Sequence, residues 1–213
     1  MSFKTLHSFG SDEITINKSR FIGYAKPVES EDEAVEFINE IKSKHSDATH
    51  NVYAYVVGET NNIQRYSDDG EPTGTAGIPV LDIIKKEDLR NTAVVVTRYF
   101  GGIKLGAGGL VRAYIKGAKI GLDAAKIVEK RLFSTVKVTI EYTLQGKLEN
   151  LLMSNEYTVK DTEYGTAVSL YILCEKDKVE ELLSMIREMS SDNFEYEITE
   201  ENYLSVVNGK VIE

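Results

Sequence analysis

NTAVVVTRYFGGIKLGAGGLVRAY, residues 91–114, is the most informative stretch of this chain for its architecture. It opens with a short, almost entirely apolar run, and the run over 93–96 predicts a strand over 92–100 that is buried on both faces. Five glycines follow within 101–109, and helical apolar spacing then continues to about Ala125. A buried strand, a glycine-rich loop and a long helix indicate a mixed α+β domain.

A second glycine-rich segment, SDDGEPTGTAGIPVLDII at 67–84, lies upstream. Four of the eleven residues over 67–77 are Gly or Pro, which predicts a loop of fixed conformation. A short helix over 78–86 follows, with Pro79 in its first turn, where a missing N–H costs little. The chain therefore contains two loops of the same kind, each leading into a helix.

The N-terminal segments have the composition of further strands and one more helix. Residues 13–28 are rich in β-branched and aromatic types and read as extended structure closed by Pro27, and 52–57 reads as a strand. Ser30 and Glu33 form a capping box before a run of helical apolar spacing, which predicts a helix of about four turns.

The second half of the chain has a different order of elements. Its apolar spacing predicts β-α-β-β-α-β, with strands over 135–142, 159–163, 167–174 and 194–198 and helices over 144–152 and 179–186. That order is typical of the ferredoxin-like split βαβ motif. We therefore predict two domains, an N-terminal one over 1–133 and a C-terminal one over 134–213, which suits a chain of 213 residues.

Charge differs sharply between the two predicted domains. Residues 1–133 carry 18 Lys and Arg against 18 Asp and Glu, whereas 134–213 carry 7 against 16, so the whole net charge of −9 belongs to the second half. This distribution speaks against a protein that coats nucleic acid indiscriminately, but it permits a local basic surface on the first half.

The predicted long helix supplies such a surface. Residues 98–119 contain five basic residues and no acidic one, and we predict a basic face made by Arg98, Lys104, Arg112, Lys116 and Lys119. The three on the helix lie within about 60° of one another, opposite the apolar side. Tyr99 and Phe100 adjoin this face, and either could stack on a base or belong to the core.

The two glycine-rich loops are candidate anion sites, because glycine lets backbone N–H groups approach a ligand and a helix N-terminus is partly positive. The residues predicted to contribute are Gly74, Thr75, Gly77, Gly101, Gly102, Gly106, Gly108 and Gly109. The alternative is that these glycines only permit tight turns and close packing of a helix on a sheet. Neither loop has the residues of a phosphate-binding Walker A loop or of a dinucleotide-binding turn.

The acidic residues of the first loop, Asp68, Asp69 and Glu71, admit two interpretations. Carboxylates can hold a divalent cation, but adjacent ones in a turn more often cap backbone N–H groups or pair with an arginine, here Arg65 or Arg98. We favour the second interpretation. The three histidines, His7, His45 and His50, have no zinc-site spacing, and no nucleophile motif occurs, so we predict no metal, no cofactor and no catalytic residue.

Location and redox chemistry follow from a few residues. The single cysteine, Cys174, lies in an alternating apolar run, which predicts a buried side chain and no disulfide within the chain. We see no export signal, and the longest apolar runs fall far short of the roughly 20 residues that span a bilayer. We therefore expect a cytoplasmic protein without membrane association.

The two glycine-rich stretches together resemble the signature of the YigZ/IMPACT family, and SRFIG at 19–23 and HNVYAY at 50–55 agree with it. The resemblance implies a first domain similar to domain IV of elongation factor G and to the second domain of a small-subunit ribosomal protein. It implies a ferredoxin-like second domain, similar to those of the same elongation factor. Eukaryotic relatives regulate translation by competing for a partner that activates a stress kinase, whereas bacterial members lack a settled activity.

Two functional hypotheses follow. The first is a non-catalytic, translation-associated regulator that binds RNA, the ribosome or a translation factor through the basic face. The second is an enzyme or small-ligand binder that acts on a phosphorylated or anionic compound at the paired loops. The residues favour the first, and they do not indicate an oligomeric state.

Overall fold

The computed structural model describes residues 2–212 and divides the chain into two compact units. One comprises Phe3–Glu129, and the other begins at Lys130. Each unit has its own antiparallel sheet with helices, so the predicted α+β class is confirmed. Over residues 2–212, no helix combines the length and the apolar character that crossing a membrane requires.

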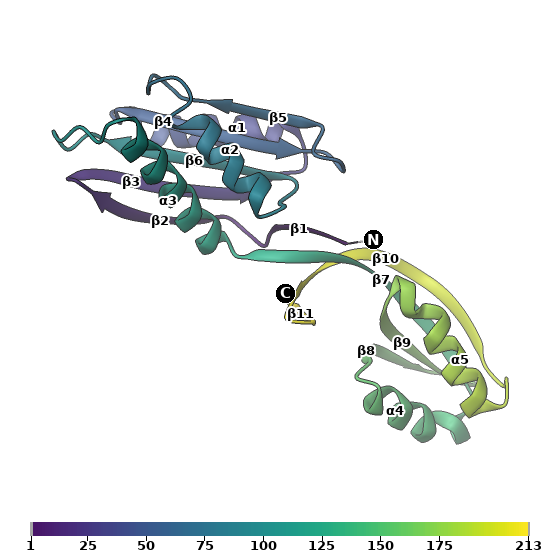
Figure 1. Cartoon of the computed structure of the whole chain (residues 1–213). Coiled ribbons are helices and arrows are strands. Elements are labelled where there is room, and N and C mark those ends of the chain that lie inside the picture. Colours follow the sequence, from purple (N-terminus) through teal and green to yellow (C-terminus); the bar gives the residue numbers. More distant parts are fainter. Residues whose placement is uncertain (1, 213) are drawn as a thin grey trace. The chain divides into compact units, whose positions relative to one another are not determined.

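The first unit is built on a five-stranded sheet (Figure 1). Its strands, in spatial order, are β2 (Gly10–Ile16), β3 (Ser19–Pro27), β6 (Thr92–Tyr99), β4 (His50–Val57) and β5 (Ile63–Ser67). The central strand β6 is buried on both faces along nearly its whole length, as its apolar run predicted. The segment predicted as one extended run over 13–28 is a hairpin, because Asn17 and Lys18 adopt positive φ and turn the chain between β2 and β3.

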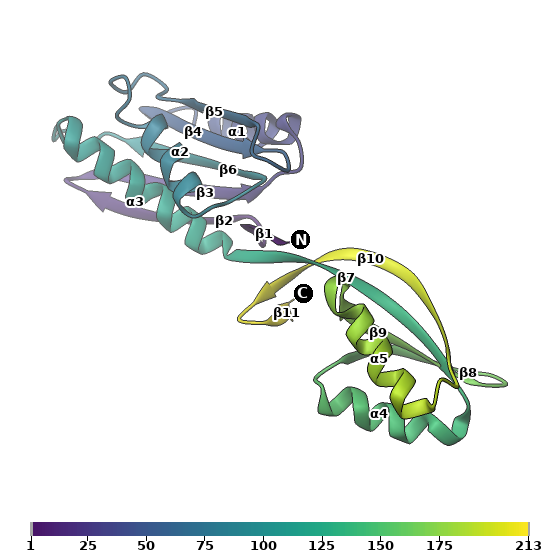
Figure 2. The ribbon, with the colours of Figure 1, turned by 45° about the vertical axis from the view of Figure 1, so that its right-hand side comes forward.

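Helices cover both faces of this sheet. Figures 1 and 2 show α2 (Gly77–Lys86) and α3 (Ala107–Ala125) on one face and α1 (Glu31–Lys44) on the other. Each face has its own hydrophobic core. Ser30 caps α1 as predicted, since its hydroxyl accepts a hydrogen bond from the Glu33 N–H at 3.2 Å.

Helix α3 lies unusually close to the sheet because glycines face each other across the contact. A Cβ atom placed on Gly23 of β3 would lie 1.9 Å from the carbonyl oxygen of Gly117 in α3. A Cβ on Gly121 would likewise lie 2.9 Å from the carbonyl carbon of Gly23. These contacts fix how α3, and therefore its outer face, is placed on the unit.

The second unit has the predicted β-α-β-β-α-β order. Its helices are α4 (Gln145–Ser154) and α5 (Val179–Ser190), and single 3₁₀ turns, η1 (Tyr142–Leu144) and η2 (Lys176–Lys178), precede them. Its strands are β7 (Ile127–Ile140), β8 (Thr158–Tyr164), β9 (Val168–Glu175), β10 (Glu195–Val207) and β11 (Lys210–Ile212), in the spatial order β11-β10-β7-β9-β8. Strand β1 (Ser2–Leu6) belongs, from Phe3 onward, to the first unit.

The core of the second unit lies between one face of its sheet and the two helices. Cys174 of β9 is part of this core, so its predicted burial is confirmed. Burial raises the pKa of the Cys174 thiol to about 11. The thiol is therefore protonated at neutral pH and packs as an apolar group.

Candidate functional site

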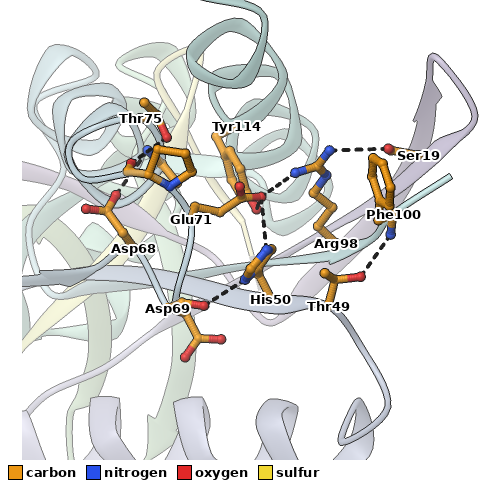
Figure 3. Close-up of polar contacts among 12 residues, drawn as sticks. Ser19, Thr49, His50, Asp68, Asp69, Glu71, Thr75, Arg98, Phe100 and Tyr114 are labelled. Carbon is orange, nitrogen blue, oxygen red and sulfur yellow. Dashed lines mark hydrogen bonds and ion pairs between the residues drawn. The ribbon is translucent and has the colours of Figure 1, made fainter. Parts of the chain in front are cut away.

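A network of buried polar side chains joins the first glycine-rich loop to β6 and α3. The Glu71 side chain is only 4% exposed, and its Oε1 accepts hydrogen bonds from Arg98 Nη1 at 2.5 Å and from Tyr114 Oη at 2.7 Å (Figure 3). His50 Nε2 lies 3.7 Å from the same oxygen, and His50 Nδ1 donates to the Asp69 carbonyl. Burial and the neighbouring carboxylate raise the pKa of Tyr114 far above its ordinary value, so its phenol remains a neutral donor.

Arg98 belongs to this network and not to an exposed surface. The residue is 5% exposed, and its guanidinium lies over the rings of Phe21 and Phe100 and within 3.5 Å of the Ser19 hydroxyl. Glu71 neutralises its charge. Our sequence prediction placed Arg98 on the basic face, and the structure corrects it: Arg98 lies on the strand face that carries Val94 and Val96, beneath the helices.

The carboxylates of the first loop bind N–H groups and side chains of the protein itself. The Asp68 carboxylate accepts hydrogen bonds from the N–H groups of Gly74 (2.9 Å), Ala76 (3.1 Å) and Gly77 (2.8 Å), and so caps the start of α2. The interpretation that these carboxylates cap N–H groups and pair with an arginine is confirmed for Asp68 and Glu71. Within residues 2–212, no group of three or more His, Cys, Asp or Glu side chains is placed to hold a metal ion.

This capping weakens the case for the first loop as an anion site. The N–H groups of Gly74 and Gly77, predicted to bind a foreign anion, already donate to Asp68. The hydroxyl and the N–H of Thr75, from the same prediction, both donate to the Pro72 carbonyl, at 2.6 and 3.0 Å. Asp69 is occupied as well, because its carboxylate accepts from the Asn51 N–H and from Lys42.

The second loop has fewer such internal bonds: among its glycines, within residues 2–212, only the Gly101 N–H donates to a side chain, the Ser19 hydroxyl, at 3.2 Å. Gly102 and Gly106 have φ of +85° and +69°, and a Cβ on either would meet nothing within 4 Å, so glycine serves the backbone conformation there. Gly101 is different, because its Cβ would lie 1.9 Å from the Lys18 carbonyl oxygen. Gly106 is the N-cap of α3 and makes no side-chain cap, and the first turn, which includes Gly108 and Gly109, has no acidic residue.

The outer face of α3 carries the exposed cations. Arg112 and Lys116 are exposed, and among residues 2–212 neither makes an ion pair; the same holds for Lys104 on the loop. Lys119 differs, because Asp123 (3.1 Å) and Glu87 (3.2 Å) bind its ammonium group and raise its pKa. The apolar side of the helix, from Leu110 to Leu122, is buried as predicted. Hereafter the basic face means Lys104, Arg112 and Lys116.

The two loops leave the same end of the sheet, because β5 and β6 are each antiparallel to β4 and so run in the same direction (Figure 1). Glu71 of the first loop contacts Arg98, and the second loop begins just beyond that residue, after β6 ends at Tyr99. The structure thus links the two loops through a buried ion pair. Of the five predicted cations, three form the basic face and Arg98 and Lys119 do not.

A second polar chain, which the sequence did not indicate, lies on the α1 face of the same sheet. His45 Nε2 is 2.6 Å from Tyr24 Oη, His45 Nδ1 is 2.8 Å from Tyr99 Oη, and Tyr99 donates to Asp47 at 3.0 Å. Burial lowers the pKa of the His45 imidazole, and the charge of Lys44 adds to this effect. Tyr99 is therefore held by side chains of this face and is not part of the basic face.

Comparison with known proteins places these features in a family. The model of the Impact N-terminal domain matches residues 17–122, and a domain of unknown function, DUF1949, matches residues 138–193. IMPACT family member YvyE of Bacillus subtilis is 43% identical over 203 residues, which cover 95% of this chain and 94% of the relative. The chain belongs to the IMPACT family.

Other IMPACT relatives agree with this assignment. IMPACT family member YigZ of Escherichia coli is 32% identical over 188 residues, covering 87% of this chain and 92% of the relative. Protein IMPACT of Danio rerio is 37% identical over 100 residues, which are 45% of this chain and 31% of that protein. A crystal structure described as that of a hypothetical protein aligns with a TM-score of 0.58 at 29% identity, covering 93% of this chain and 98% of the other.

The matched residues locate the candidate site within the family. Residues 17–122, which match the Impact N-terminal domain, contain the buried network, both glycine-rich loops and the whole basic face. The two-domain bacterial type is defined by this domain together with DUF1949. The site therefore lies in the named domain of the IMPACT family, and the acidic half of the chain carries the other.

Proposed function

We propose that this IMPACT family protein is a non-catalytic, translation-associated binding protein that contacts RNA, including ribosomal RNA, through the basic face. The observation that carries the proposal is that Arg112 and Lys116 are exposed on α3 without an ion pair among residues 2–212. The helix is held so that this side faces solvent, because its apolar side packs into the core. The translation role and the likeness to elongation factor G domains, implied by the family resemblance, are parts of this proposal.

Electrostatics explains why the face would select a polyanion. Arg112 and Lys116 are one helical turn apart, about 6 Å along the axis, and Lys104 adds a third charge from the loop before the helix. Phosphate groups bound by these cations release condensed counterions, which makes binding favourable at low salt and weaker as salt rises. The net charge of −9 belongs to residues 134–213, so attraction is confined to this local surface.

The alternative, a small anionic ligand held by both loops, has less support. Asp68 already accepts from the three backbone N–H groups that the first loop would offer. Only the second loop, apart from the Gly101 N–H that donates to Ser19, then has backbone N–H groups to offer, and a single helix N-terminus is a weak basis for a specific small-molecule site. We therefore place RNA binding first.

A double charge reversal, Arg112→Glu with Lys116→Glu, tests the proposal. We expect affinity for a fluorescein-labelled RNA to fall at least tenfold in fluorescence anisotropy at low salt, and ribosome cosedimentation to fall with it. Loss of two phosphate contacts would also reduce the magnitude of the slope of log K against log salt by about 1.4, since each contact with a single strand contributes about 0.7 to that slope.

The matched control is Lys85→Glu with Lys86→Glu, in the last turn of α2. Both lysines are exposed, and the change in net charge is the same. If the control variant loses as much affinity as the α3 variant, net charge rather than the basic face governs binding. If the α3 variant binds RNA and ribosomes like the unmodified protein, the basic face is not the site.

A further inference from the structure

Phe100 is a large aromatic residue that the fold leaves 45% exposed at the point where β6 ends. Its backbone is fixed on both sides. The Phe100 N–H donates to the Thr49 hydroxyl at 3.0 Å, and the N–H of Gly101 donates to the Ser19 hydroxyl at 3.2 Å. Because Gly101 also packs against the backbone of Lys18, the ring leaves the chain from an anchored position rather than from a free loop.

The ring of Phe100 also rests on a fixed cation. The guanidinium carbon of Arg98 lies 5.4 Å from the centroid of the Phe100 ring (Figure 3). It also lies 5.4 Å from the centroid of the Phe21 ring. Phe21 is fully buried and meets the ring of Tyr114 edge to face. Glu71 holds Arg98 in place. A series of planar groups thus runs from the core to the surface, and Phe100 is its outermost member.

An exposed, pre-ordered aromatic face is a suitable surface for another planar group, because little side-chain freedom is lost on binding. In proteins that bind single-stranded nucleic acid, such rings lie beside cations that follow the phosphates, and bases stack on them. Lys104 is four residues from Phe100, and no acidic residue occurs over 98–119. The bases of a duplex are stacked on one another, so only an unpaired base offers its face to Phe100.

We infer that the Phe100 ring is a stacking platform for an unpaired base, and that the preferred ligand of this protein is single-stranded RNA. This inference rests on the proposed RNA-binding function and names its ligand class. A protein partner would instead use Phe100 as apolar contact area, for which leucine is nearly as good. The sequence on the C-terminal side of the ring, up to residue 119, is free of acidic residues, and the charge of Glu71 is balanced by Arg98, which favours the polyanion.

The test compares a short unpaired oligouridine with an RNA duplex of the same length, both labelled, binding to the full chain in fluorescence anisotropy. We expect tighter binding of the single strand. Phe100→Leu should weaken single-strand binding about 5- to 140-fold, the range that corresponds to loss of one stacked base, and leave duplex binding unchanged. Phe100→Trp should retain single-strand affinity. Phe9→Leu, at a phenylalanine that is 51% exposed elsewhere on this unit, is the control and should change nothing.

The outcomes separate this inference from the function on which it rests. If Phe100→Leu binds the single strand like the unmodified protein while the Arg112 and Lys116 reversal does not, the RNA-binding function stands and the stacking inference is overturned. Equal affinity for strand and duplex, or equal loss in the leucine and tryptophan variants, also overturns it. If the unmodified protein binds neither RNA, the proposed function itself fails. Unchanged thermal unfolding midpoints confirm that the variants are folded.

Discussion

Glu71 is the acceptor on which the buried network depends. Its carboxylate is the only counter-charge that the structure places on the guanidinium of Arg98 within residues 2–212, and it accepts from Tyr114 as well. We expect Glu71→Gln to lower the free energy of unfolding by about 3–5 kcal/mol, because a buried cation is left without its partner. The measurement is urea unfolding at neutral pH followed by circular dichroism, since the chain has no tryptophan.

The control for that change is Glu13→Gln. Glu13 pairs with Arg20 at 2.6 Å, but both side chains are more than half exposed, and solvent screens such pairs so that they add little to stability. Similar losses for the two variants would show that the network around Glu71 does not behave as a buried ion pair.

The alternation of side chains along β6 distinguishes Arg98, which is buried, from the exposed cations of the basic face. Arg98 follows Val94 and Val96 at intervals of two, so its side chain points with theirs into the core beneath α3. The prediction for Arg98 was wrong because it rested on the number of basic residues over 98–119 and not on this alternation. The helical wheel of α3 predicted the exposed positions of Arg112 and Lys116 correctly. No local pattern indicates that the acceptor for Arg98 is Glu71, because the two residues meet only when the loop folds onto the sheet.

Close packing of α3 against β3 ties the position of the basic face to a few glycines. Gly23→Ala would place a methyl group 1.9 Å from the Gly117 carbonyl oxygen, and backbone atoms must shift to admit it. We expect a loss of about 3 kcal/mol in the free energy of unfolding, at the upper end of the range for overpacked cores. RNA affinity should also fall, because the helix that carries Arg112 is displaced.

Gly146→Ala is the matched control. Gly146 lies in the first turn of α4, and a Cβ there meets nothing within 4 Å. Stability should be unchanged or higher by up to about 1 kcal/mol, as expected for alanine in a helix. If Gly23→Ala is tolerated equally well, the glycine contacts do not set the position of α3.

Element boundaries were harder to predict than element types. Strand β10 extends over Glu195–Val207, whereas the sequence predicted only 194–198, because the polar, exposed residues over 199–202 interrupt the alternation before the buried end of the strand at Ser205 and Val206. The hairpin of β2 and β3 was read as one run, since Asn17 and Lys18 turn the chain without glycine or proline. The helices were predicted more closely because their apolar sides are strongly periodic.

The division of the chain into a charge-balanced half and an acidic half leads to a prediction for the separate parts. A fragment over residues 1–133 contains the whole basic face and both cores of the first unit. We expect it to bind RNA at least as tightly as the full chain, because the removed residues carry the net charge of −9. Anisotropy with the same RNA measures this, and circular dichroism checks that the fragment is folded.

The complementary fragment, residues 134–213, should bind no RNA under the same conditions. Loss of binding by the folded 1–133 fragment would show that the second unit contributes contacts of its own.

The α+β class and the β-α-β-β-α-β order could be predicted from sequence, because both follow from apolar periodicity. Which residues meet around the site could not, because those contacts join segments far apart in the chain.

Asp68 has a consequence for any ligand screen on this protein. A carboxylate tethered six residues before Gly74 is present at its N–H group at a local concentration of the order of millimolar or more. A free anion must compete with that internal ligand before it can bind the first loop. Inorganic phosphate below that concentration should therefore leave the Asp68 carboxylate bound to the loop. The loop should bind added phosphate only in a variant that lacks this carboxylate.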